Sequence, residues 1–136
     1  MKKLLFLSAI GCCLLADTNI NPSGLPQNIQ DFVKTHFINE NIVKAEKDWD
    51  SYEIKLSNGT ELDFSKSGDI KEIDGKYSPI PDSIMQDVLK LAKENQKNAK
   101  LMEIEKEWNG YKLKFNNNYK VYIDNNGTIT KTVLDD

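Results

Sequence analysis

This sequence contains one structural unit written twice. Residues 49–72 align with residues 108–131 at a constant offset of 59, and six of the 24 aligned pairs are identical. The identical pairs are Trp49/Trp108, Tyr52/Tyr111, Lys55/Lys114, Asn58/Asn117, Gly68/Gly127 and Ile70/Ile129. Because two copies of one unit adopt the same local structure, the repeat predicts a doubled architecture rather than one irregular domain.

The repeat extends upstream at a shorter offset. Leu25-Pro26 aligns with Ile80-Pro81 at an offset of 55, and Ile29 aligns with Ile84. The second copy is therefore longer by four residues, which we place between its helix and its first strand. The predicted units span residues 25–74 and 80–133, joined by the link 75–79. Residues 17–24, which contain Asn, Pro, Ser and Gly, indicate a flexible leader.

Each copy is predicted to begin with a helix. In the first copy, apolar residues recur at helical spacing at Ile29, Phe32, Val33 and Phe37. Pro26 suits the first position of that helix, where its missing N–H needs no partner. In the second copy the expected apolar stripe is Ile84, Val88 and Leu91. Such short amphipathic helices are stable only when packed against other elements.

The rest of each copy alternates between apolar and charged residues with a period of two, which is typical of strands with one buried face. Turn-forming Asn and Gly residues separate the runs, so hairpins should join them. The strands expected in the first copy are 42–49, 52–57, 61–65 and 69–73. We predict an α+β fold of two tandem α-β-β-β-β repeats, with the helices on one face of an antiparallel sheet. The two sheets should lie side by side or pack closely, because a lone 50-residue unit buries too little surface.

The first 16 residues have the layout of a secretory signal peptide: Lys2 and Lys3, an apolar run over residues 4–15, and Ala16 at the expected cut. An apolar run of about 12 residues is too short to span a bilayer, so no transmembrane segment is expected. Cleavage after Ala16 predicts a periplasmic or secreted protein. The alternative is that the run ending at Cys12 is a lipoprotein box, with the chain anchored through a lipidated Cys12.

Cleavage also changes the composition. Both cysteines, Cys12 and Cys13, lie in the signal, so the mature chain would have no disulfide, no thiolate metal ligand and no cysteine nucleophile. Loss of Lys2 and Lys3 takes the formal charge from −3 to −5. An acidic chain with no Arg lacks the basic surface of a nucleic-acid-binding protein.

The pattern of aromatic, Gly and apolar positions resembles the PepSY-like family, which is also described as β-lactamase-inhibitor-like. The residues that carry the resemblance are Leu25-Pro26, Trp49-x-x-Tyr52-x-Ile54-x-Leu56, Asn58-Gly59, Leu62-x-Phe64, Gly68-x-Ile70 and Ile73-Asp74. The resemblance covers about residues 25–133 and implies an exported, non-enzymatic binding module that inhibits a peptidase or another envelope enzyme. The chain lacks the inter-repeat cysteines of some inhibitor relatives, so a disulfide-pinned binding loop is not implied.

The charged strand faces supply the candidate contact residues. Glu103, Glu105 and Glu107 share one face of a predicted strand, and Lys112 and Lys114 on the next strand can pair with them. Clustered carboxylates also suit a cation such as Ca²⁺ or a basic partner. Metal binding is the alternative hypothesis here, and no complete Ca²⁺-binding loop is present in the sequence.

The aromatic residues divide into two groups. Trp49, Trp108, Tyr52 and Tyr111 recur at equivalent places beside apolar residues, so we predict that they belong to the core. Tyr122 is out of phase with its apolar neighbours and should project from the charged face as a contact anchor. Tyr77, in the link, is a second and weaker candidate.

Two further residues are candidates for chemistry. His36 is the only histidine, and no nucleophile with a matching base accompanies it in the sequence, so no catalytic residue, cofactor or metal ligand is assigned. Asn126 begins Asn126-Gly127-Thr128, with Asp124 two residues earlier, which fits an N-glycosylation acceptor as well as a turn. The sequence therefore favours a non-enzymatic protein with an unidentified envelope partner, and the alternative is a protein that binds a small ligand or cation on its acidic sheet face.

Overall fold

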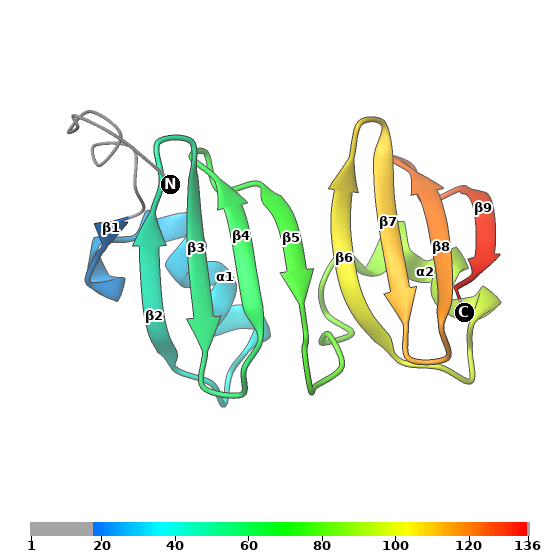
Figure 1. The fold of residues 1–136 in the computed structure, drawn as a ribbon, viewed down its shortest axis with the longest axis horizontal. Helices are drawn as coiled ribbons and strands as arrows, with labels where there is room; N and C mark the ends of the chain where they lie inside the picture. Colours follow the sequence, from blue (N-terminus) through cyan, green and yellow to red (C-terminus); the bar gives the residue numbers. More distant parts are fainter. Residues whose placement is uncertain (1–17, 136) are drawn as a thin grey trace, which may run out of the picture.

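Strand pairing follows the order of the chain. In the computed structural model, which describes residues 18–135, one antiparallel sheet contains nine strands in the order β1 to β9 (Figure 1). The first unit contributes β1 (Thr18–Asn19), β2 (Ile42–Lys47), β3 (Ser51–Leu56), β4 (Glu61–Ser65) and β5 (Ile70–Asp74). The second contributes β6 (Leu101–Glu107), β7 (Gly110–Phe115), β8 (Tyr119–Asp124) and β9 (Ile129–Leu134). The predicted antiparallel strands are confirmed.

Two helices cover the same face of this sheet, α1 (Gln27–His36) and α2 (Gln86–Asn95), each in the connection that precedes its four strands (Figure 1). The predicted α+β fold, with helices on one face only, is therefore confirmed. The core lies between helices and sheet. Its fully buried members come from both units: Ile29, Leu56, Leu62, Phe64, Ile73, Ile84, Leu89, Ile104, Leu113 and Val121.

The two units join through β5 and β6. Three residue pairs form this seam: Glu72 with Glu105, Ile73 with Ile104, and Asp74 with Glu103. Ile73 and Ile104 are both fully buried on the helix side. The sheets of the two units thus lie side by side as expected, and the seam places two carboxylate pairs on the opposite side.

Residues 18–24, expected from their composition to be a flexible leader, have regular structure. β1 pairs with β2 at the edge of the sheet, and Pro22–Gly24 form a 3-10 helix. The backbone N–H of Ile20 donates to the carbonyl of Ala45 at 2.9 Å, and Leu25 is buried. The proposed signal peptide and Cys12 lie outside the described residues.

The start of α2 differs from the expectation. Both helices have ten residues and begin 59 positions apart, so the four extra residues precede α2 instead of following it. Met85, directly before the helix, has a left-handed backbone (φ 51°, ψ 41°), which interrupts the helical phase expected from Ile84. Leu89 and Ala92 therefore face the core, and Leu91, predicted to face inward, is 51% exposed.

No helix among residues 18–135 is long and apolar enough to cross a membrane.

Candidate functional site

The face of the sheet without helices carries two rows of side chains, polar except for one valine, that run across all the long strands. Cross-strand register defines the Glu72 row as Glu46, Glu53, Asp63, Glu72, Glu105, Lys112, Tyr122 and Lys131, from β2 to β9. It defines the Asp74 row as Lys44, Lys55, Glu61, Asp74, Glu103, Lys114, Lys120 and Val133. The period-two pattern of each strand thus becomes a continuous charged surface.

Charge along these rows is segregated. The Glu72 row begins with five consecutive carboxylates, and the Asp74 row has three consecutive carboxylates at its middle. Six of these carboxylates lie on β4, β5 and β6 and form what we call the acidic centre: Glu61, Asp63, Glu72, Asp74, Glu103 and Glu105. Lysines follow on β7 and β8. Like charges directly opposite each other on neighbouring strands destabilise a sheet, so this centre favours a positively charged ligand.

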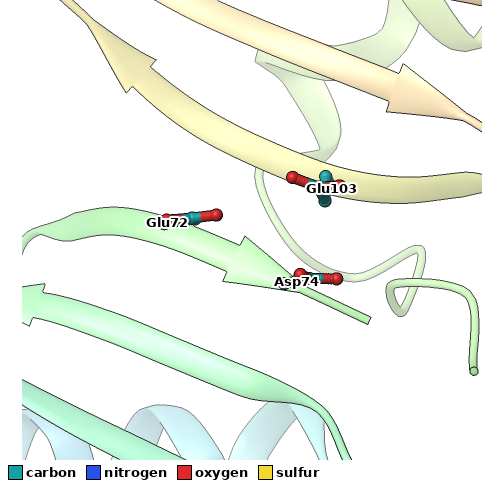
Figure 2. A group of neighbouring side chains, drawn as sticks. All are labelled: Glu72, Asp74 and Glu103. Atoms are coloured by element: carbon teal, nitrogen blue, oxygen red, sulfur yellow. The ribbon is translucent and has the colours of Figure 1, made fainter. Parts of the chain in front are cut away.

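Glu72, Asp74 and Glu103 come closest together at the seam (Figure 2). One carboxylate oxygen from each lies within 4.8 Å of the others, and all three residues are partly buried. Burial, and the charges of Glu105, Glu103, Asp74 and Asp63, raise the pKa of Glu72. An ionised Glu72 is therefore costly in this setting unless a cation or a basic group approaches it.

Lysines neutralise part of the acidic centre. Lys112 Nζ lies 3.0 Å from Glu105 Oε1, and Lys114 Nζ lies 3.9 Å from Glu103 Oε2. The hydrogen bond with Glu105 raises the pKa of Lys112. Lys76, in the link, lies 3.4 Å from Asp74 and 3.6 Å from Glu61. Within residues 18–135 none of these ion pairs involves Glu72.

A shallow hollow opens on the same face beside the seam. It has a volume of about 420 Å³ and lies over β2 to β5. Its lining is mostly charged: Lys44, Glu46, Glu53, Lys55, Glu61, Asp63, Glu72 and Asp74, with Ile54 and Leu62. Because both rows contribute to it, the hollow and the acidic centre form one surface.

The structure brings most of the predicted contact residues together. Glu103 and Glu105 pair with Lys114 and Lys112 across β6 and β7, as the sequence pattern indicates. Glu107 lies at the end of β6, opposite Gly110 and away from the acidic centre. Their role as partner contacts remains a prediction.

Tyr122 lies on the charged face as predicted, directly opposite Lys112 and Lys131. It is half-buried, and Lys131 Nζ lies 5.4 Å from the centre of its ring. The aromatic ring therefore lies between two lysines of the Glu72 row.

Glu72 and Asp74, the central carboxylates of the site, are absent from the residues predicted from the sequence. Both alternate with Ile73 in β5, so their shared face was readable from the sequence. Their proximity to Glu103 was not, because it depends on β5 pairing with β6 across the boundary between the copies.

The prediction that the tryptophans belong to the core is wrong. Trp49 is 69% exposed and Trp108 is 97% exposed. β2 ends at Lys47 and β6 ends at Glu107, so both tryptophans lie in hairpin turns, where the alternation of a strand no longer applies. Tyr52 and Tyr111, by contrast, lie inside strands and pack against the core.

The remaining candidates lie elsewhere. Tyr77, in the link, is 88% exposed. His36 Nδ1 lies 2.7 Å from Ser83 Oγ, which connects the end of α1 to the turn before α2, and burial lowers the pKa of His36. Asn126 is exposed in the β8–β9 turn, where its N–H donates to Asp124 Oδ1 at 2.9 Å. Its glycosylation stays a prediction.

Comparison with known proteins gives one family and several solved structures. The model of the family described as "Putative beta-lactamase-inhibitor-like, PepSY-like" matches residues 15–71 and 50–131. A comparison with curated proteins finds no match.

Three similar solved structures come from Bacteroides species. A "putative calcium-regulated periplasmic protein" from Bacteroides thetaiotaomicron is 28% identical, with a TM-score of 0.78 over 86% of this chain and 96% of its own. A "putative periplasmic protein" from Bacteroides vulgatus is 32% identical, with a TM-score of 0.77 over the same shares. A second "putative periplasmic protein of unknown function" from Bacteroides vulgatus is 30% identical, with a TM-score of 0.76 over 87% of this chain and 99% of its own.

Proposed function

The chain belongs to the PepSY-like family, and from this premise we propose that it is an exported, non-enzymatic binding protein of the cell envelope. Its helix-free sheet face holds a protein partner, and that partner is an envelope enzyme which the protein inhibits. Export is supported by the signal-like residues 1–16 and by the periplasmic description of the similar structures.

The observation that carries this proposal is the open, charge-segregated face itself. Among residues 18–135, helices cover only the other side of the sheet, so the side chains of the Glu72 and Asp74 rows face outward (Figure 1). Protein recognition surfaces join electrostatic complementarity with a few aromatic anchors. Here the acidic centre and the lysines around Tyr122 lie next to each other on a rigid sheet. The partner should therefore present a basic segment to the acidic centre.

Capture from envelope extract tests this function. With the chain from residue 17 as bait, we expect a protein to be retained and its enzyme activity, assayed as peptidase and as β-lactamase, to fall when the bait is added. Tyr122→Ala should weaken retention by roughly fivefold or more, because truncation of an aromatic anchor costs upwards of about 1 kcal/mol. Lys90→Ala, on the exposed side of α2, is the matched control and should leave capture unchanged. Capture of nothing, or equal loss in both variants, would contradict the proposal.

A second candidate function is calcium binding at Glu72, Asp74 and Glu103. Three carboxylates within 4.8 Å supply oxygen ligands of the kind that Ca²⁺ prefers, and water completes such a shell. One of the similar proteins is described as calcium-regulated. A bound Ca²⁺ would also relieve the repulsion between the carboxylate pairs of the seam.

Thermal unfolding with Ca²⁺ or with chelator tests this second candidate. Calcium bound only by the folded state raises the unfolding free energy, by about 2.7 kcal/mol when its concentration is a hundred times its Kd. We expect the midpoint to rise in the unmodified chain and in the control Glu94→Gln on α2, but not in Glu72→Gln. The rise should shrink on acidification, because the raised pKa of Glu72 keeps its carboxyl protonated to a higher pH. If calcium does not change the unfolding midpoint, calcium binding is excluded as a function. That outcome does not bear on the partner-binding proposal.

A further inference from the structure

Trp49 and Trp108 lie at the same end of the sheet. Neighbouring strands run in opposite directions, so the β2–β3 and β6–β7 turns lie at the same end of the sheet (Figure 1). These turns are separated by four strand intervals, a distance of about 19 Å at the usual strand spacing. We call these two turns, residues 48–50 and 108–109, the tryptophan end. The two indole rings at this end are too far apart to bind one small molecule between them.

Both turns are held by hydrogen bonds, so the tryptophans are presented by ordered backbone. In the first, the N–H of Asp48 donates to the carbonyl of Ser51 at 2.9 Å, and that of Trp49 donates to Asp48 Oδ1 at 2.7 Å. In the second, Lys106 Nζ donates to the carbonyls of Glu107 and Gly110 at 3.0 and 3.2 Å. Exposure of a ring at such a position is a stable property of the fold.

The chain enters the sheet at the same end. β1 runs antiparallel to β2, and Thr18 pairs with Lys47, the last residue of β2 before the first tryptophan turn. β1 therefore begins at the end of the sheet where the first tryptophan turn lies. Thr18 and Cys12 are only six positions apart, a reach of at most about 22 Å. Any membrane that holds the apolar segment 4–15 or a lipidated Cys12 would face the tryptophan end.

We propose that the tryptophan end docks on a phospholipid bilayer, with both indole rings in the interfacial layer. Tryptophan favours this layer because its ring has an apolar body and one N–H that stays hydrated. The first turn carries Asp48 and Asp50, and Glu107 at the end of β6 lies beside the second, so attraction to anionic lipid does not drive the contact. This orientation leaves the sheet face that carries the Glu72 and Asp74 rows perpendicular to the membrane and open to a partner. It is independent of the partner-binding proposal.

Intrinsic fluorescence tests the docking directly, because Trp49 and Trp108 are the only tryptophans in the sequence. The chain from residue 17 has no cysteine, so Asp17→Cys can be coupled to a maleimide lipid in phosphatidylcholine vesicles. A matched variant is coupled instead through Lys97→Cys, between α2 and β6 at the opposite end of the sheet. Each is measured with ordinary and with brominated acyl chains, and Trp49→Phe and Trp108→Phe variants separate the two signals.

We expect the chain attached through residue 17 to show blue-shifted tryptophan emission. Brominated lipid should quench most of this emission at both tryptophans, and the quenching should be the same at low and high salt. The chain attached through residue 97 should keep its emission. No quenching of the chain attached through residue 17 would overturn the proposal, and so would equal quenching from both attachment points. Quenching at only one tryptophan would overturn the two-ring arrangement.

Discussion

Replacing Ile104 by alanine is expected to lower the free energy of unfolding by about 2–5 kcal/mol, the usual cost of removing a fully buried large aliphatic side chain. Ile104 is 0% exposed in β6 and lies opposite Ile73, also 0% exposed, across the seam. Only three residue pairs form this seam, so the isoleucine pair is its apolar contact. The substitution removes packing from both units at once.

Chemical denaturation monitored by circular dichroism measures this effect. Because the two units share one core, we expect a single transition whose midpoint falls without a second step. Ile38→Ala is the matched control: the same substitution at a residue 79% exposed should change stability by less than about 0.5 kcal/mol. Two separate transitions in the unmodified chain, or equal effects of the two substitutions, would show that the seam does not couple the units.

The sequence predicts most of this architecture because period and repetition are local signals. Alternation in each strand depends only on which side faces the helices, and Asn-Gly turns mark where that alternation restarts. The second copy repeats both signals, so the number and order of the strands and the charged face were readable without any contact between distant residues. The pairs of Glu103 with Lys114 and Glu105 with Lys112 follow from one hairpin alone.

The errors arise where a periodic pattern continues past the end of an element. In the sequence, Trp49 and Trp108 continue the apolar alternation of the strands before them. In the structure those strands end before the tryptophans, and the chain turns. Leu91 keeps the helical phase of Ile84, but the left-handed backbone at Met85 resets it. Repetition of the tryptophans in both copies favours a core role, yet the structure places both rings in solvent.

The acidic centre was hidden for a different reason. Its residues come from β4, β5 and β6, and the last of these belongs to the second copy. The sequence pattern within one copy does not indicate which strand of the other copy pairs with its last strand. The acidic centre therefore depends on the one strand pairing that joins the copies.

Gly110→Ala is expected to destabilise the protein by about 3 kcal/mol or more, at the upper end of the cost of overpacking. A Cβ at this position would lie 1.9 Å from the carbonyl oxygen of Ile123 and 2.9 Å from the Cα of Asp124. These are backbone atoms of β8, so no side chain can rotate away, and β7 and β8 must separate. Ser51 holds the equivalent place in the first copy, where β3 accommodates a small side chain.

The comparison that isolates this effect is Gly24→Ala. Nothing lies within 4 Å of a Cβ built at Gly24, so that substitution should leave the denaturation midpoint almost unchanged or slightly raised. A loss of stability in Gly110→Ala alone would locate the cost in the close approach of β7 to β8. Similar midpoints in the two variants would mean that the strands have room to relax, and that the closeness of Gly110 to Ile123 does not constrain this sheet.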